Sequence, residues 1–563
     1  MNGSGSKSQS SLTSWPKRIQ MTAYIFLVLS GGVLYGLHVQ NTKTAIFAFF
    51  STVPWILLSL HPKVKGNGLC FLAMIYLMFI IGAYWLRGFN TKSWITASLF
   101  YIPFFLPMFY LPRIIRSRWP SFPLALLWPL IFTGMEWFRI RFSPGEISFC
   151  QLGYSQVEST KLIQIADIAG VSAISFILCA IAGLIAEIIL YRNYQESIIN
   201  SRRLLLTQAL GVFLLYVTTI FYGYLNDTEK YYSLGPHIQV VQPSLREWRE
   251  PEAARRNFDI LVYHTISTHR PQLADVIVWP ENSLLNPLVV KKDHKLQLHE
   301  YYGTRLVELS MQLNTPILVD GPSIDSDQIQ EYHTATFIHP DGRYETYNKI
   351  MLVPWSEYVP FRETAKLFGE KSLRAYLNFV RSFVWFAADI KPGDTDNIRA
   401  FNITTRNGEH LTFGTPICFE ITTTRVINKW HDSVDKNGKK GVNFLLNPTN
   451  EILLGESIRQ QTLAICRFRA IEGRVSVVRA ANNGVSALID PNGRIRESFM
   501  DNSGANEPTA FYPQIILDSR RGTFYTRHGD WLPFSCFFIS IWLSILALWH
   551  HYHKRYTKAK LYV

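Results

Sequence analysis

The stretch Leu-Thr-Phe-Gly-Thr-Pro-Ile-Cys-Phe-Glu, residues 411–420, indicates most about the fold of this chain. Its apolar start is typical of a buried strand, and Gly414-Thr415-Pro416 then breaks that strand. The turn presents a cysteine, Cys418, at the strand end, where a nucleophile can be held. The sequence therefore predicts a buried strand that ends in a catalytic thiol.

Two other apolar runs end in residues that a thiol nucleophile needs. Val276-Ile277-Val278-Trp279-Pro280 leads to Glu281, and Tyr347-Asn348 leads to Lys349. A carboxylate can take the proton from a thiol, and an ammonium can stabilise the oxyanion that forms on attack. We therefore expect Glu281, Lys349 and Cys418 to form one catalytic site.

Strand-like and helical runs alternate between residues 226 and 530, around these three motifs. The expected strands are His237–Gln242, Val276–Trp279, Thr315–Val319, Thr334–Ile338, Leu411–Phe413, Val442–Leu446, Val475–Arg479 and Val485–Ile489. Amphipathic helices are expected at Pro251–Arg270, Gln297–Leu313 and Glu456–Glu472. This alternation predicts a layered α/β domain.

Apolar stretches close to the roughly 20 residues that cross a bilayer as a helix make up most of the remaining chain. They are Ala23–Leu37, Thr44–Leu60, Leu69–Leu86, Trp94–Leu111, Phe122–Phe138, Ala166–Leu190, Leu204–Leu225 and Trp531–Trp549. Aromatic residues make up 14% of the 563 residues and charged residues only 17%, which also favours a membrane protein. The sequence therefore predicts about eight transmembrane helices.

Lysine and arginine cluster in alternate connections between these stretches, which predicts the orientation in the membrane. Both termini should be cytoplasmic, and the α/β domain should lie outside the cytoplasmic membrane. The expected divisions are a disordered tail (1–16), seven helices (17–225), the extracytoplasmic domain (226–530), the eighth helix (531–549) and a basic tail (550–563). The net charge of +14 reflects this topology and anionic lipid, so no nucleic-acid partner is expected.

The motifs resemble a known family. Trp279-Pro280-Glu281, Tyr347-Asn348-Lys349 and Ile417-Cys418-Phe419-Glu420 are similar to motifs of the carbon-nitrogen hydrolase, or nitrilase, superfamily. The Glu-Tyr-Val-Pro segment at 357–360, within a chain of membrane helices, is similar to the apolipoprotein N-acyltransferase family. The resemblance implies a nitrilase-like four-layer sandwich joined to a polytopic helical membrane domain.

The resemblance also implies the reaction. An acyl chain of a membrane phospholipid would form a thioester on Cys418 and then pass to the N-terminal amine of a diacylglyceryl-cysteine apolipoprotein. The implied location is the bacterial cytoplasmic membrane, with the catalytic domain on the periplasmic side. We expect no cofactor, no metal and a monomer, since no CxxC or histidine pair suggests a metal site.

Further residues match family positions or flank the expected site. Glu357 and Glu420 occupy acidic positions that would support the catalytic groups. Trp248 and Trp355 are candidates for a lid that faces lipid, and Phe419 and Asn450 for the pocket wall. Residues 447–455, Thr462 and Phe419 depart from the family pattern, which bears on substrate preference.

Two alternatives to acyl transfer remain open at this stage. A membrane-anchored nitrilase-like amidase would use the same three residues on a soluble amide. A catalytically silent membrane scaffold would not need Cys418 at all.

Overall fold

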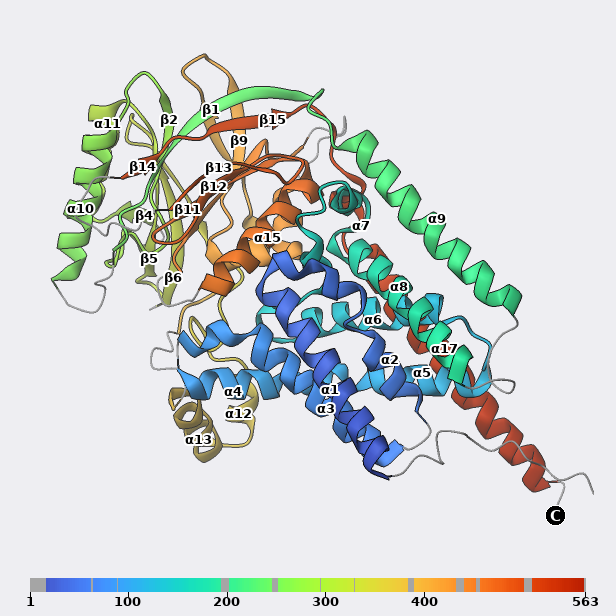
Figure 1. Cartoon of the computed structure of the whole chain (residues 1–563). Helices are drawn as coiled ribbons and strands as arrows, with labels where there is room; N and C mark the ends of the chain where they lie inside the picture. The colour runs from blue at the N-terminus through green and yellow to red at the C-terminus, as the bar shows by residue number, and fades with distance from the viewer. Residues whose placement is uncertain are drawn as a thin grey trace, which may run out of the picture.

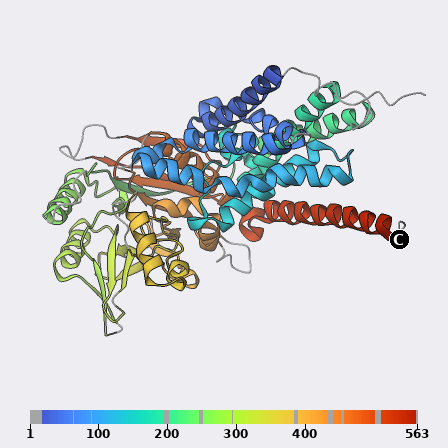
Figure 2. The same ribbon diagram turned by 90° about the horizontal axis from the view of Figure 1, so that it is seen from below.

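The computed structural model describes residues 17–61, 64–88, 90–193, 202–245, 252–293, 295–328, 330–382, 389–431, 440–451, 456–500 and 509–560. Apolar helices form one end of the molecule and two β-sheets with their covering helices form the other (Figure 1). Figure 2 shows the same separation from below.

The helical region follows the predicted apolar stretches. It contains α1 (Lys17–Gln40), η1 (Thr42–Phe49), α2 (Val53–Leu60), α3 (Val64–Gly82), η2 (Tyr84–Gly88), α4 (Thr91–Phe100), η3 (Ile102–Phe105), α5 (Leu106–Arg118), α6 (Leu124–Phe142), η4 (Pro144–Glu146), η5 (Leu152–Gln156), η6 (Leu162–Ile165), α7 (Ala166–Ala169), α8 (Val171–Asn193), α9 (Arg202–Asn226) and α17 (Trp531–Lys560), where η marks a 3₁₀ helix. Several apolar helices are thus confirmed.

Length and composition separate these helices into two groups. Within the described residues, five helical segments are long and apolar enough to cross a membrane: Thr42–Leu60, Thr91–Arg118, Val171–Tyr191, Arg202–Asn226 and Trp531–His553. Ile25–Gln40 and Gly66–Gly82 are shorter apolar helices. Helix α6 carries Glu136, Arg139 and Arg141 near its carboxyl end, which lowers its hydropathy.

The last helix is longer than expected. The prediction ended the eighth helix at Trp549, whereas α17 continues to Lys560. Neither glycine nor proline follows Pro533 in this stretch, and lysine, arginine and alanine are good helix formers, so nothing ends the helix where its hydrophobicity falls. In both views α17 extends beyond the other helices (Figures 1 and 2).

The sheet region consists of two sheets. The first contains β1 (Tyr232–Val241), β2 (Ala274–Val278), β3 (Val289–Lys292), β4 (Lys295–Leu298), β5 (Ile317–Asp325), β6 (Gln330–Ile338), β7 (Tyr344–Asn348), β14 (Ala510–Phe511) and β15 (Gln514–Asp518). The second contains β8 (Phe401–Thr404), β9 (His410–Gly414), β10 (Phe444–Thr449), β11 (Ser476–Ala481), β12 (Ser486–Ile489) and β13 (Ile495–Phe499). The helices are α10 (Ala253–Thr268), α11 (Glu300–Leu313), α12 (Arg362–Leu367), α13 (Glu370–Arg381), η7 (Thr395–Asn397), η8 (Cys418–Thr422), α14 (Thr424–His431), α15 (Glu456–Gly473) and α16 (Phe524–His528).

Alternate residues of the first sheet pack in opposite directions. Ile277 and Val319 pack with α10 and α11 in one core, whereas Val276, Val278 and Leu318 pack with the second sheet in another. This period of two is what a strand buried on both faces requires. Helices α14 and α15 cover the outer face of the second sheet, through residues such as Trp430 and Ala470. The predicted four-layer sandwich is confirmed.

Helix α15 joins the two ends of the molecule. Its residue Cys466 belongs to the core of the sandwich, while Ile465 and Phe468 belong to the core of the helical region. Just after α15, Arg474 forms a buried ion pair of 2.6 Å with Asp167 of α7. The two regions therefore share a packed interface, and the cavity described below lies along it.

Candidate active site

Three strand ends bring the predicted catalytic residues together. Strand β2 pairs with β5 in parallel. Strand β7 has the same direction, because β6 lies between β5 and β7 and is antiparallel to both. Glu281 and Lys349, which follow β2 and β7, therefore lie at the same edge of the first sheet. Lys349 Nζ donates a hydrogen bond of 3.0 Å to Glu281 Oε1. Cys418 follows β9 in the facing second sheet. Glu281, Lys349 and Cys418 all lie in one site, as expected from the carboxyl ends of buried strands.

Lys349 is fully buried and lies between two carboxylates. Its Nζ also donates a hydrogen bond of 2.7 Å to Glu357 Oε1. Burial lowers the pKa of Lys349, but Glu357 and Glu281 more than reverse this effect and hold it well above its usual value. Burial raises the pKa of Glu357, but Lys349 and His333 lower it to about 2. The site therefore rests with a charged ammonium and a charged Glu357.

A histidine and aspartate pair supports Glu357 from behind. His333 Nε2 lies 2.6 Å from Asp320 Oδ1, and its Nδ1 lies 3.6 Å from Glu357 Oε1. Burial lowers the pKa of His333, but Asp320 and Glu357 raise it to about 10. Val353 N–H donates to the second oxygen of Glu357 at 2.8 Å. These contacts fix Glu357 and thereby the position of the Lys349 ammonium.

The backbone of Cys418 is held in a sharp turn. Its φ is +47°, in the left-handed region that costs a non-glycine residue about 1–2 kcal/mol. Asn447 Nδ2 donates to the carbonyls of Pro416 and Cys418 at 2.8 and 3.3 Å. Thr449 Oγ1 lies 3.3 Å from Cys418 Sγ. The second sheet thus over-determines a strained conformation, as is common at functional sites.

Glu420 stabilises this turn and does not line the cavity. Its Oε2 accepts from Ile417 N–H at 2.8 Å, and its Oε1 accepts from Ile350 N–H at 2.7 Å and from Tyr347 Oη at 2.9 Å. One fully buried carboxylate therefore joins the nucleophile turn to the segment that carries Lys349. Glu420 thus helps to hold the Cys418 turn and the Lys349 segment in position relative to each other.

The thiol rests in its protonated form. Burial raises the pKa of Cys418 well above its usual value, and Glu281 raises it further. Lys349 and Thr449 act in the opposite direction and are outweighed. Because only the thiolate is a strong nucleophile, the thiol needs a base at the moment of attack. Glu281, which also accepts a hydrogen bond of 2.9 Å from Asn450 N–H, is placed for that role.

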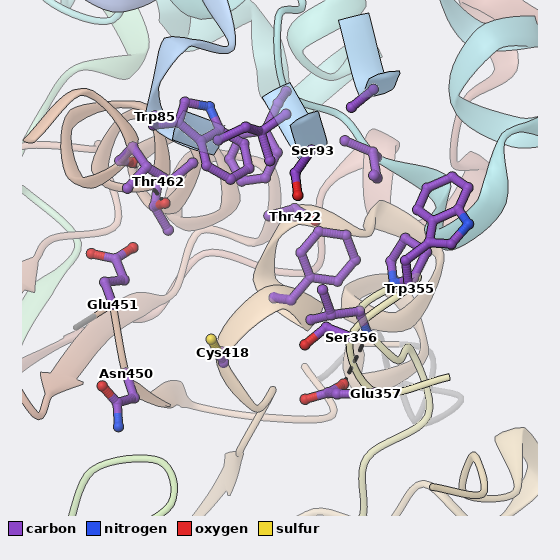
Figure 3. A pocket seen from close by; sticks show the side chains of 18 of the residues that line it. Trp85, Ser93, Trp355, Ser356, Glu357, Cys418, Thr422, Asn450, Glu451 and Thr462 are labelled. Carbon is purple, nitrogen blue, oxygen red and sulfur yellow. Dashed lines mark hydrogen bonds between the residues drawn. The ribbon is translucent and has the colours of Figure 1, made fainter. Parts of the chain in front are cut away.

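A cavity of about 590 Å³ connects this site with the apolar helices. Cys418, Glu281 and Glu357 line it from the sheet region. Its wall in the helical region comes from Phe79, Ala83, Trp85, Leu86, Thr96, Ala97, Phe100 and Tyr101. Figure 3 shows Cys418, Asn450 and Glu451 on one side of this cavity and Trp85 and Ser93 on another.

The other predicted residues fall at different places. Phe419 and Asn450 line the cavity, and Phe419 packs against Phe149 with ring centroids 6.3 Å apart. Trp355, at φ +61°, lines the cavity and packs edge to face on Phe100 of α4. Trp248 lies outside the described residues.

Several site residues were missed by the sequence reasoning. The pair of His333 and Asp320, the hydroxyl of Thr449 and the buried ion pair of Glu451 with Arg479, at 2.6 Å, all lie in or behind the cavity wall. A signal was available for Thr449 and Glu451, since Thr449 ends the strand beside that of the nucleophile and Glu451 follows two residues later. None marked His333 or Asp320, which are mid-strand.

Three side chains of the site, Glu281, His333 and Glu357, are close enough together to hold a cation. Ligand atoms of Glu281, His333 and Glu357 lie within 4.8 Å of one another. Lys349 Nζ, however, bonds both carboxylates, and His333 Nε2 is engaged by Asp320. The ammonium therefore already supplies the positive charge that these carboxylates require.

Comparison with known proteins gives consistent matches. Residues 31–184 match the apolipoprotein N-acyltransferase N-terminal domain, and residues 242–510 match the carbon-nitrogen hydrolase domain. Apolipoprotein N-acyltransferase 2 of Treponema denticola is 28% identical over 390 residues, which cover 67% of this chain and 69% of that protein. Apolipoprotein N-acyltransferase of Chlorobaculum tepidum is 25% identical over 585 residues, which cover 97% and 99%.

Among solved structures, Saccharomyces cerevisiae Nit3, a member of branch 10 of the nitrilase superfamily, matches 54% of this chain and 96% of its own at 16% identity and a TM-score of 0.34. The N-terminal domain match precedes the carbon-nitrogen hydrolase match in this chain. The relative from Chlorobaculum tepidum aligns over almost its entire length. This chain belongs to the apolipoprotein N-acyltransferase family, and its enzymatic domain is of the carbon-nitrogen hydrolase type.

Proposed function

We propose that this protein transfers an acyl chain from a membrane phospholipid to the N-terminal amine of a diacylglyceryl-cysteine lipoprotein, through a thioester on Cys418. The observation that carries this proposal is the shared cavity. A single space reaches from the nucleophile to the apolar helices, so a lipid chain lying among those helices can present its ester to the thiol. A soluble amidase needs no such apolar wall.

The first half-reaction forms the thioester. Glu281 takes the proton of Cys418, and the sulfur attacks the ester carbonyl of the phospholipid. Lys349 and the backbone N–H groups that follow Cys418 stabilise the resulting oxyanion. The carbon–oxygen bond then breaks, and the proton on Glu281 passes to the departing lysophospholipid.

The second half-reaction transfers the acyl group. The neutral α-amine of the lipoprotein attacks the thioester carbonyl, and Glu281 takes a proton from the attacking nitrogen. The carbon–sulfur bond breaks, an amide forms, and the sulfur regains a proton. Glu281 thus serves both steps, while Glu357 holds Lys349 in place at 2.7 Å.

The membrane orientation is part of the same proposal. The positions of lysine and arginine support cytoplasmic termini and a catalytic domain on the outer side of the bacterial cytoplasmic membrane. The phospholipid donor would then come from the outer leaflet. A monomer suffices, since Glu281, Lys349 and Cys418 belong to one chain.

N-acylation of a diacylated lipopeptide, followed by mass spectrometry, tests this function. Cys418→Ala should abolish the reaction without changing folding. Cys466→Ala is the matched control, because Cys466 is buried in α15 and does not line the cavity. Normal N-acylation by Cys418→Ala would contradict the proposal. Turnover of soluble amides without N-acylation would favour the amidase alternative.

A further inference from the structure

A second, polar pocket lies at the junction of α6, α14, α16 and α17. Its volume is about 290 Å³. It is lined by Trp137, Ile140, Arg141, Glu146, Thr423, Thr424, Arg425, Asn428, Lys429, Thr526, Arg527, Gly529 and Asp530. None of these residues lines the larger cavity that contains Cys418.

The pocket lining carries more positive than negative charge. Arg141 and Arg425 both pair with one carboxylate, Glu146. Lys429 and Arg527 are exposed and form no ion pair within the described part of the chain. Among the residues that the structure describes, these two cations have no carboxylate partner, and both line one small concave surface.

The remaining acid of the pocket is already engaged. Asp530 Oδ1 accepts a hydrogen bond of 2.6 Å from Tyr525, and its Oδ2 accepts one of 3.4 Å from Thr424. Among the described contacts no ion pair joins Asp530 to Lys429 or Arg527. The lining carries four cationic side chains and two carboxylates, so the pocket has an excess of positive charge. Such a pocket favours an anion.

Aromatic side chains place this pocket at the edge of the apolar region. Trp137 packs edge to face on Phe534 and Phe142, with ring centroids 5.5 and 6.3 Å apart. Phe142 and Phe534 are 61% and 49% exposed, although both are large and apolar. Large exposed apolar side chains mark surfaces that contact a partner or a membrane, so the charged pocket borders a surface suited to lipid chains.

The basic residues of the pocket are not a topological signal. Arg425, Lys429 and Arg527 belong to the long domain between α9 and α17, and the rule on lysine and arginine applies to short loops. Their concentration around one pocket therefore needs a local explanation, and a bound phosphate supplies one.

We propose that this pocket binds a phosphate group carried by a membrane phospholipid, at a site separate from the acyl-donor cavity. Lys429 and Arg527 would contact the phosphate oxygens, and the acyl chains would lie along the exposed Phe142 and Phe534. The pocket includes Thr423, which directly follows the helix of the nucleophile, Cys418–Thr422. A lipid bound here secures that segment against α6 and α17.

Native mass spectrometry of the full-length, delipidated protein in detergent tests this site. The protein would be titrated with dioleoylphosphatidylglycerol and, in parallel, with dioleoylglycerol, which lacks the phosphate. In Lys429→Gln/Arg527→Gln, the apparent affinity for the phospholipid should fall roughly 25-fold, since each cation near lipid contributes about a factor of five. The affinity for dioleoylglycerol should not change.

Arg255→Gln/Arg305→Gln is the matched control, because it removes the same charge from exposed residues of α10 and α11. This variant should bind the phospholipid like the wild type. All the substituted side chains are exposed, so equal melting temperatures would show that each variant is folded.

Three results would overturn the inference. The first is an unchanged phospholipid affinity in Lys429→Gln/Arg527→Gln. The second is displacement of the phospholipid by inorganic phosphate at similar concentration, which would assign the pocket to a free anion. The third is binding of an acidic peptide that depends on Lys429 and Arg527 while lipid binding does not. The experiment measures lipid binding and not N-acylation, so a negative result here would leave the proposed acyl transfer unaffected.

Discussion

Replacing Lys349 by methionine should destabilise the sheet region and slow catalysis together. The substitution keeps the length of the side chain but removes the ammonium that donates to Glu281 at 3.0 Å and to Glu357 at 2.7 Å. Lys349 is fully buried, and the two carboxylates are only 5% and 14% exposed. The variant therefore leaves two buried acids without their shared counter-ion.

The size of the effect follows from this burial. Removing one partner of a buried ion pair costs about 3–5 kcal/mol, since the remaining charge is left unpaired. This corresponds to a fall in the melting temperature of roughly 6–20 °C for a domain of this size. Loss of one donor to the oxyanion should lower kcat by about 10²–10³.

Lys291→Met provides the matched control. Lys291 pairs with Asp325 at 2.9 Å, but its side chain is 32% exposed. Water screens an ion pair at the surface, so this variant should unfold close to the wild-type temperature and keep full acyl transfer. Thermal unfolding in one detergent, followed for wild type and both variants, gives the comparison.

Acid should narrow the difference between wild type and Lys349→Met. In the wild type the pKa of Glu357 is lowered from 4.5 to about 2, so its contribution to stability is present above pH 4.5 and is lost as the pH falls toward 2. In the variant that contribution is smaller, because Lys349 no longer lowers this pKa. Equal melting temperatures for Lys349→Met and Lys291→Met at pH 7, or a gap that widens in acid, would refute the reasoning.

Two further predictions concern the thiol and the cavity. Glu281→Gln removes a carboxylate that raises the pKa of Cys418. The midpoint of the pH-dependent alkylation of Cys418 by iodoacetamide should therefore fall, while acyl transfer stops. A midpoint that rises would contradict the electrostatic role of Glu281. Ala83→Phe places a bulky ring in the cavity wall, 7% exposed in the wild type, and should raise KM for long-chain donors at least fivefold with little change for short-chain ones. An equal effect on all chain lengths would show that the chain does not lie beside Ala83.

The convergence of Glu281, Lys349 and Cys418 could be predicted because these residues follow strands that the sequence marks clearly. The runs before Glu281 and Cys418 are apolar, of strand length and ended by proline-containing turns. Parallel strands bring their carboxyl ends to one edge of a sheet, which places Glu281 beside Lys349. The packing of the two sheets then brings Cys418, at the end of β9, to the same site. The alternation of strands and helices predicted a layered α/β domain, and the family resemblance supplied its four layers.

The supporting residues could not be predicted in this way, because they depend on tertiary contacts. His333 lies in the middle of β6 and acts through Asp320 of β5, at a pairing that only the sheet register defines. The cavity wall from Ala83 to Tyr101 depends on how the helices dock on the sandwich, which no local pattern encodes. Helices α12 and α13 were missed for a related reason, since both are largely exposed.

Detection of an acyl-enzyme is the most direct test of the central claim. Purified protein would be incubated with a defined phospholipid and analysed by intact-protein and peptide mass spectrometry, with Cys418→Ala and Cys150→Ala in parallel. Cys150 is the sharper control, because it lines the same cavity but is not at a strand end. The account predicts a hydroxylamine-labile acyl adduct on Cys418, absent from Cys418→Ala, retained in Cys150→Ala and discharged by a diacylated lipopeptide. An adduct that only water discharges, or no adduct on folded protein with any phospholipid, would contradict it.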